Sequence, residues 1–442
     1  MKQYLKVIDY IYNLNKYGIK LGLNNITYLL SLLGNPHLKM KIIHIAGTNG
    51  KGSTSAILSS ILKNSRYKVG LYTSPHLVSF QERMMINGKM ISRKDIIRLL
   101  EKMETAIQKV AITEGYQHPT FFEVITAMAF LYFYEKDVDF AVMEVGLGGR
   151  LDATNVAQSL ISIITHIDFD HMDKLGNTLT EIAYEKASII KKNTWVINAK
   201  QSKDANEEIK RMAIEKESTI YSFGQEIKAK LLTSSLEGND FDYSGIYHHW
   251  KSLHVPLIGE YQLENASMAI AAAELIDHIG YPIHEQDIRR GLKNSRWPGR
   301  FEIIQERPTV ILDGGHNPDG VQNFMKNLKR LFPEKRMIAV LGIFQDKDYP
   351  RIIQSIVPYV NQVVLTMAQH VRATPTHILA KEAEHYISAG QITEKSTVTA
   401  AIAEAFHIAK EDDVICITGS LYTVGEAEEY FLKRKKENKG HL

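Results

Sequence analysis

The stretch His44-Ile-Ala-Gly-Thr-Asn-Gly-Lys-Gly-Ser53 constrains the fold of this chain more than any other part of the sequence. The apolar run from Ile42 to Ala46 leads into three glycines around Lys51, and a helix-like run from Ser55 to Leu62 follows. We therefore expect a strand, a glycine-rich turn and a helix. In such a turn the backbone N–H groups and the helix N-terminus bind phosphate. Lys51 would supply a charge for the outer phosphates and Ser53 a hydroxyl for magnesium, which predicts a site for a nucleoside triphosphate.

The spacing in this turn differs from the common phosphate-loop pattern. That pattern places four residues between the first glycine and the Gly-Lys pair, and a hydroxyl residue directly after the lysine. Here Gly52 separates Lys51 from Ser53. A glycine turn with an incidental lysine is the plainer alternative. The strand before the turn and the helix after it favour nucleotide binding.

The composition indicates a soluble globular protein. The chain has 442 residues, which is enough for two domains, with 44% hydrophobic and 23% charged residues. A net charge of +3 gives no indication of a nucleic acid or membrane partner. The one cysteine, Cys416, excludes an intramolecular disulfide and a cysteine-rich metal site. No run reaches the roughly 18 apolar residues of a membrane span, and the N-terminus indicates an amphipathic helix rather than a secretory signal, so we expect a cytoplasmic enzyme.

Polar side chains follow four predicted strands at the points where those strands end. These residues are Lys51 and Ser53, Ser74 and His76, Glu144, and Asp170 and His171. Strand ends on the same edge of an open parallel sheet line one crevice. We therefore expect Ser53, Ser74, Glu144 and His171 to hold one or two magnesium ions against nucleotide phosphates. Taken alone, His171 could equally be a structural histidine and Glu144 a member of a salt bridge.

The second half of the chain predicts a further domain. From Lys203 to Lys251 the sequence is polar and turn-rich, and we expect peripheral strands and loops there; a strong helix with Asn265 near its start follows. Pro298 and Gly299 then interrupt the helical pattern. Beyond them, predicted helices alternate with strands at 309–312, 337–341, 362–365 and 414–418, as in a doubly wound sheet.

The predicted fold class is α/β. It combines an N-terminal P-loop ATPase domain, built on a parallel sheet, with a smaller C-terminal Rossmann-like α/β domain. We place the ATP-binding domain at residues 1–295, the linker at 296–300 and the C-terminal domain at 301–442. Across the cleft between them, Arg300 and Asp313 would address the ribose and phosphates of the nucleotide.

Five motifs in this order carry a family resemblance. They are GTNGKGS from Gly47, TSPHLVSFQERMMING from Thr73, EVGLGGRLDATN from Glu144, DH at Asp170 with LGNTLTEIAYEKASIIK from Leu175, and DGGHNPDG from Asp313. The chain resembles the folylpolyglutamate synthase and dihydrofolate synthase family, within the Mur-type ATP-dependent amino-acid ligases, over nearly its whole length. The resemblance implies ATP-dependent ligation of L-glutamate to folates, to dihydropteroate or to both, through an acyl phosphate, with a C-terminal glutamate-ligase domain.

The resemblance also implies the residues of the site. The implied catalytic residues are Lys51, Lys186 and His316. The implied ATP-binding residues are Asn49, Gly50, Lys51, Gly52, Ser53, Asn265, Arg300 and Asp313. The implied metal ligands are Ser53, Ser74, Glu144, His171 and Lys186, the last carbamylated on its amine. The implied folate-binding residues are Gly22, Leu23, Asn24, Thr120, Phe121, Phe122, Glu123, Leu151, Asp152 and Ala153. Magnesium, one or two ions, and a monovalent cation such as K⁺ are the implied cofactors besides ATP, and the resemblance favours a monomer.

Three positions depart from the family pattern. Tyr261 stands where relatives usually have a histidine before the glutamine, a change that affects the implied adenine contacts and not the phosphate contacts. Asp168 and Ser188 replace common glycines. Two other functions stay open: a Mur-type ligase acting on a cell-wall precursor, and a non-catalytic nucleotide-binding switch.

Overall fold

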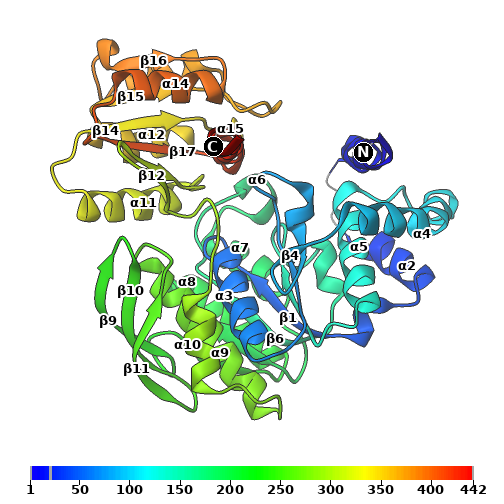
Figure 1. The fold of residues 1–442 in the computed structure, drawn as a ribbon. Helices are drawn as coiled ribbons and strands as arrows, with labels where there is room; N and C mark the ends of the chain where they lie inside the picture. The colour runs from blue at the N-terminus through cyan, green and yellow to red at the C-terminus, as the bar shows by residue number, and fades with distance from the viewer. Residues whose placement is uncertain (1, 19–21, 441–442) are drawn as a thin grey trace.

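The computed structural model describes residues 2–18 and 22–440, and in these ranges the chain forms two α/β domains (Figure 1). The N-terminal domain contains an eight-stranded sheet and a separate three-stranded sheet, and the C-terminal domain contains a six-stranded sheet. The predicted fold class, a P-loop domain with a parallel sheet followed by a smaller Rossmann-like domain, is confirmed. None of the helices in the described ranges is both long and apolar enough to cross a membrane.

The eight-stranded sheet carries the strand ends that the sequence singles out. Its strands are β1 (Lys41–Ala46), β2 (Val69–Tyr72), β3 (Met84–Ile86), β4 (Lys89–Met90), β5 (Phe140–Glu144), β6 (Ser159–Ile164), β7 (Trp195–Asn198) and β8 (Thr219–Ser222). Their order is β4-β3-β2-β5-β1-β6-β7-β8, and every pair from β2 to β8 in this order is parallel. Both faces of β1 and β5 are buried, which explains their near-continuous apolar sequences.

Helices cover both faces of this sheet. They are α1 (Lys2–Asn13), α2 (Asn24–Leu32), α3 (Lys51–Asn64), α4 (Arg93–Ile112), α5 (Phe121–Glu135), α6 (Met172–Leu175), α7 (Leu179–Ala187), α8 (Lys203–Glu215), α9 (Tyr261–His278) and α10 (Glu285–Lys293). Side chains alternate along β1, so Ile43 and Ile45 pack with α3, α9 and α10, whereas Ile42 packs with α1, α2, α4 and α5. The helices thereby fix β1 and the loop that follows it from both sides.

The expectation of strands and loops from Lys203 to Lys251 is wrong for its first part, which forms α8. Ser202 caps this helix by accepting a hydrogen bond from the backbone N–H of Ala205 (3.3 Å), and Ala205 and Ile209 are buried. Charged residues between the buried positions hide the helical spacing. The remainder does form peripheral strands, which make up the antiparallel three-stranded sheet: β9 (Lys228–Ser235), β10 (Gly238–Ser244) and β11 (His249–Val255).

The C-terminal sheet has the order β12-β13-β17-β14-β15-β16 and is parallel except for β12. Its strands are β12 (Glu302–Glu306), β13 (Thr309–Leu312), β14 (Met337–Leu341), β15 (Gln362–Leu365), β16 (Ile392–Glu394) and β17 (Val414–Thr418). Two hydrophobic clusters cover its opposite faces, one with α11 (Pro318–Leu331), α12 (Tyr349–Ile356) and α13 (Thr376–Ala383), the other with α14 (Val398–Ile408) and α15 (Leu421–Gly440). This is a doubly wound sheet, whose short edge strands β12 and β16 the sequence did not predict.

Candidate active site

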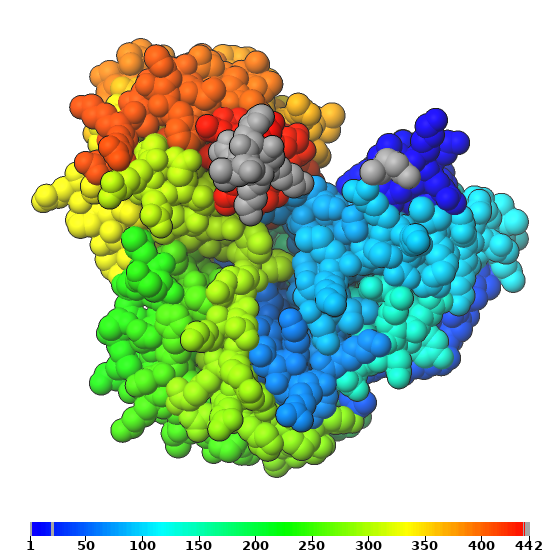
Figure 2. All heavy atoms as spheres, viewed as in Figure 1, coloured from blue at the N-terminus to red at the C-terminus, as the bar shows by residue number. Residues whose placement is uncertain are grey.

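A cavity of about 840 Å³ lies between the two domains. Its walls come from the loops after β1, β5 and β6 and, in the C-terminal domain, from the loops after β13, β14 and β17. The surface is indented between the C-terminal domain and α1 (Figure 2). All the predicted site residues line this cavity except three. Leu23 and Asn24 lie at the start of α2, and the strand-end residue His76 is likewise not part of the wall.

The glycines of the phosphate loop allow close approach of other segments. Gly50 has a φ of 91°, and a Cβ there would lie 2.3 Å from Oδ1 of Asn265. A Cβ on Gly52, the residue that departs from the common loop pattern, would lie 2.7 Å from Nε1 of Trp297. Gly52 is therefore required because the segment that joins the domains packs against the first turn of α3.

Two lysines converge on the phosphate loop. Nζ of Lys51 donates to the carbonyl oxygens of Gly47 (2.9 Å) and Thr48 (3.0 Å), and Nζ of Lys186 donates to that of Gly47 (2.9 Å). Lys186 is only 4% exposed. Burial, and then the charge of Lys51, lowers the pKa of Lys186 to about 7. Burial also lowers the pKa of Lys51. Neutral pH therefore leaves part of Lys186 as the neutral amine.

Glu144 ends β5 inside the cavity. Its carboxylate is buried and accepts one hydrogen bond among the described residues, from the backbone N–H of Ser74 (3.2 Å). Burial raises the pKa of Glu144 to about 7, and the nearby charge of Lys51 opposes this rise. A buried carboxylate with so few donors is suited to binding a cation.

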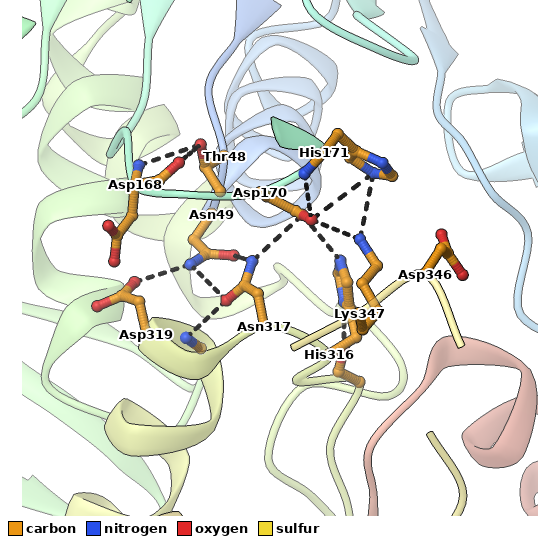
Figure 3. A network of polar contacts seen from close by, with 12 residues as sticks. Thr48, Asn49, Asp168, Asp170, His171, His316, Asn317, Asp319, Asp346 and Lys347 are labelled. Atoms are coloured by element: carbon orange, nitrogen blue, oxygen red, sulfur yellow. Dashed lines mark hydrogen bonds and ion pairs between the residues drawn. The ribbon is translucent and has the colours of Figure 1, made fainter. Parts of the chain in front are cut away.

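Asp170 connects the two domains through charged contacts (Figure 3). Oδ1 of Asp170 forms an ion pair with Nζ of Lys347, and Oδ2 lies 3.7 Å from Nε2 of His316. Lys347 also lies 3.2 Å from Nε2 of His171. Burial alone would raise the pKa of Asp170, but His316 and Lys347 outweigh it and hold this pKa well below its usual range. The carboxylate of Asp170 therefore lies near both histidines, His171 from its own domain and His316 from the other.

The loop residue Asn49 is held by the C-terminal domain (Figure 3). Nδ2 of Asn49 donates to Oδ2 of Asp319 (2.7 Å), and Nδ2 of Asn317 donates to Oδ1 of Asn49 (3.1 Å). Asn317 also caps α11, because its Oδ1 accepts from the backbone N–H of Gly320 (2.8 Å). The motif that begins at Asp313 therefore reaches the phosphate loop directly.

Ser53 and Asn265 belong to one hydrogen-bonded chain. Nε2 of Gln262 donates to Oγ of Ser53 (3.3 Å), and Nδ2 of Asn265 donates to Oε1 of Gln262 (2.9 Å). All three side chains are buried. The start of α9 is thus fixed against the first turn of α3.

Arg300 and Asp313 have different roles in the C-terminal wall. The buried carboxylate of Asp313 accepts from the backbone N–H groups of Phe301 (2.9 Å) and Gly315 (2.8 Å), and burial raises its pKa. Asp313 therefore fixes the backbone at Phe301, before β12, and at Gly315, after β13. Arg300 lines the cavity and donates to no other residue in the part of the chain that the structure describes, which leaves its guanidinium available for an anion.

Most of the predicted folate-binding residues line the same cavity, and the carboxylates of two of them accept hydrogen bonds from the backbone. Oε2 of Glu123 accepts from the backbone N–H and the hydroxyl of Thr120 (2.7 and 2.9 Å), in the capping box of α5. Asp152 accepts from the backbone N–H groups of Gly146 (3.1 Å) and Leu147 (2.9 Å), and burial raises its pKa. The remaining members that line the cavity are Gly22, Phe121, Phe122, Leu151 and Ala153.

Three residues outside the predicted ligand set place possible metal-ligand atoms close together. Within the described ranges, His166, Asp168 and Asp319 are the one group of three or more His, Cys, Asp or Glu residues whose donor atoms lie within 4.8 Å of one another. All three are half-buried. Glu144 and His171 do not form such a group, so a metal bound to them would need ligands of other kinds.

Lys347 and Gln262 were not predicted from the sequence. Asp170 was placed at the strand-end crevice as part of the Asp-His pair, but no binding role was assigned to it. Lys347 comes six residues after the end of β14, in the charged run from Asp346 to Asp348. The rule that polar residues at strand ends mark the site would have found it.

Comparison with protein families gives two matches. The Mur ligase middle domain matches residues 45–273, and the Mur ligase glutamate ligase domain matches residues 299–421. A Bacillus subtilis protein named dihydrofolate synthase/folylpolyglutamate synthase is 35% identical over 424 residues, which cover 95% of this chain and 96% of that protein.

Solved structures give the same result. Mycobacterium tuberculosis folylpolyglutamate synthase complexed with ADP superposes with a TM-score of 0.91 at 29% identity, covering 97% of this chain and 99% of that one. E. coli FolC in complex with DHPP and ADP superposes with a TM-score of 0.87 at 29% identity, covering 97% and 98%. The similarity therefore extends over both domains and the cavity between them.

Proposed function

The chain belongs to the folylpolyglutamate synthase and dihydrofolate synthase family, which are ATP-dependent amide ligases, and from this membership we propose that the interdomain cavity joins L-glutamate to folates. One observation carries the proposal: the cavity gathers the phosphate loop, Glu144 and His171 from one domain with Arg300 and His316 from the other. The curated relatives do not favour a ligase acting on a cell-wall precursor.

The nucleotide phosphates bind at the phosphate loop. Asn49 to Ser53 surround them, Asn265 and Asp313 border the nucleotide, and Arg300 approaches from the C-terminal domain. Two features support this. Lys51 donates only to carbonyl oxygens of its own loop, so no carboxylate hydrogen-bonds to its charge in the described residues. The guanidinium of Arg300 is likewise uncommitted. Phosphoryl transfer depends mainly on such positioned cations, which neutralise the phosphate oxygens.

Glu144 and His171 would hold magnesium, with Ser53, Ser74 and a carbamylated Lys186 as further ligands. These residues suit the ion. Glu144 is a buried carboxylate that accepts one hydrogen bond in the described part of the structure, from Ser74. Magnesium prefers oxygen ligands, and phosphate and water complete its coordination. When bound, magnesium supplies charge neutralisation at the phosphates. A monovalent cation such as K⁺ stays a prediction.

Carbamylation of Lys186 is supported by its surroundings. The reaction with carbon dioxide needs an unprotonated amine, and burial together with Lys51 lowers the pKa of Lys186 to about 7. The modification would replace a buried cation by an anion beside Lys51, which removes a like-charge repulsion.

The reaction has two steps. An oxygen of the acceptor carboxylate attacks the γ-phosphorus of ATP, the bond to the bridging oxygen breaks, and ADP leaves. The amine of L-glutamate then attacks the acyl carbon, phosphate leaves, and the nitrogen loses a proton. His316 borders the acyl phosphate or the glutamate. Its Nδ1–H donates to the carbonyl oxygen of Gly314 (2.9 Å), and its Nε2 faces Asp170. The wall at 120–123 and 151–153 holds the folate.

Release of ADP tests the function. We expect it to require both L-glutamate and an acceptor, and the comparison of tetrahydrofolate with dihydropteroate shows whether one or both reactions occur. Turnover with a UDP-muramyl substrate alone would instead support the cell-wall alternative, and release without glutamate dependence would contradict ligation. The predicted domain limits at 295 and 300, a monomeric state and a cytoplasmic location stay predictions.

A further inference from the structure

Arg83 is a buried cation in the cavity wall that the proposed chemistry does not use. It ends a short 3₁₀ helix, Phe80–Arg83, is 6% exposed and lines the cavity. Its Nε donates to Nδ1 of His76 (2.8 Å), so the other ring nitrogen of His76 carries the hydrogen and donates to the hydroxyl of Tyr12 (3.2 Å). His76 is therefore a neutral acceptor, and it adds no negative charge beside Arg83.

The neighbouring acid does not neutralise Arg83 either. Glu82 directs its carboxylate to the backbone N–H groups of Leu77 (2.7 Å), Val78 (3.0 Å) and Ser79 (2.6 Å). In the described part of the chain no carboxylate forms an ion pair with Arg83, and its terminal nitrogens make no hydrogen bond. Burying a guanidinium with most of its donors unpaired is costly. The arrangement therefore calls for an anion from outside the chain.

The geometry places this cation near the reacting end of the cavity. The backbone N–H of Thr73 donates to the carbonyl oxygen of Arg83 (3.2 Å), and the next N–H, that of Ser74, donates to Glu144 (3.2 Å). Two consecutive backbone groups thus join Arg83 to the proposed metal ligand. On its other side the guanidinium lies 5.4 Å from the ring centroid of Phe121, which stacks on Tyr12 at 5.7 Å.

The acceptor itself supplies a suitable anion. A folate ends in a glutamyl residue with two carboxylates, and activation of the γ-carboxylate leaves the α-carboxylate without a partner. Pteroate has no such second group. A guanidinium presents a planar pair of donors that matches a carboxylate. We propose that Arg83 binds the α-carboxylate of the folate acceptor and so distinguishes folates from pteroate, an inference that rests on the proposed function.

The experiment compares tetrahydrofolate with its α-carboxamide, which has the same shape without the charge. For the unmodified protein we expect kcat/KM to be about 30-fold or more higher for the acid. In Arg83→Gln the KM for the acid should rise to that for the amide, while the KM values for the amide and for L-glutamate stay unchanged. Arg83→Lys should keep a partial preference, because it retains charge without the paired donors. Arg307→Gln, whose side chain is 77% exposed, is the matched control and should keep the full preference.

Two results for the variants would contradict the role proposed for Arg83. A preference for the acid that survives in Arg83→Gln, or a rise confined to the KM for L-glutamate, would overturn the assignment. If the variants fail to fold, the unmodified protein still tests it, since equal use of acid and amide contradicts an α-carboxylate site. No glutamate-dependent turnover with either acceptor would refute the proposed function, whereas turnover without preference would refute only the role of Arg83.

Discussion

Lys51 and Lys186 donate to the same acceptor, and Nζ of each lies 2.9 Å from the carbonyl oxygen of Gly47. One lysine belongs to the phosphate loop and the other to a helix more than a hundred residues later in the chain. Their proximity means that a change in charge on one alters the other, which links the state of Lys186 to phosphate binding.

Lys51→Ala should lower kcat/KM for ATP by about 10³-fold or more, because it removes the charge that the loop offers to the outer phosphates. The fold should persist, since Lys51 bonds only to its own loop. ADP release and a thermal melt measure the two effects. Lys63→Ala, exposed in the last turn of the same helix, is the control. Activity within about tenfold of the unmodified protein would refute the phosphate-loop assignment.

Lys186→Ala should be nearly inactive, and bicarbonate or a short carboxylic acid should restore part of the activity by supplying the missing carboxylate. The fraction of neutral amine at Lys186 grows as the pH rises through about 7, so carbamylation should increase in that direction. Intact-mass measurement of the active protein would detect the added carbon dioxide. An unmodified Lys186 in fully active protein contradicts the carbamate, and Lys192→Ala, at an exposed position, is the control.

Glu144→Gln should abolish magnesium-dependent turnover yet stabilise the ligand-free protein above pH 7. The folded-state pKa of Glu144 is raised from 4.5 to about 7, so the folded chain binds more protons than the unfolded chain between these values. The free energy of unfolding therefore falls as the pH rises through that window, by about 1–3 kcal/mol for this group. In the glutamine variant this decrease in the free energy of unfolding should be absent. Urea unfolding at pH 5 and pH 8 measures the free energy in both proteins, with exposed Glu114→Gln as control.

Asp170→Asn and Lys347→Met should each destabilise the protein by about 2–4 kcal/mol, because each removes one partner of a buried ion pair. The two side chains are 10% and 8% exposed. The double variant should cost less than the sum of the single changes, which a double-mutant cycle of unfolding free energies measures. Additive effects would show that the pair does not act as a unit across the domains.

The strands of this fold could be predicted because their sequences are simple. The apolar runs at β5 and β6 are buried on both faces, and the polar residues that follow them meet at one sheet edge, as the topology of a parallel sheet requires. Helix α8 was missed because charged residues outnumber its few buried positions. Strand β16 was missed because its three residues are too few to show an alternation of apolar and polar side chains.

Contacts between the domains could not be predicted in the same way. Asp170 and Lys347 are 177 residues apart, and their ion pair depends on how one domain is rotated against the other, which no local pattern encodes. The same limit explains Leu23 and Asn24, since motif position does not specify which face of α2 meets the cavity. Family resemblance placed Arg300, Asp313 and His316 at the cavity. It gave no indication that the carboxylate of Asp313 accepts hydrogen bonds from backbone N–H groups.

Trp297, which lies where a side chain on Gly52 would otherwise stand, gives the chain an intrinsic fluorescence reporter. The indole touches the first turn of α3, so a phosphate arriving there alters the local polarity that sets its emission. The other two tryptophans, Trp195 and Trp250, belong to β7 and β11. Nucleotide titrations can therefore be followed in unlabelled protein, with Trp297→Phe identifying the signal.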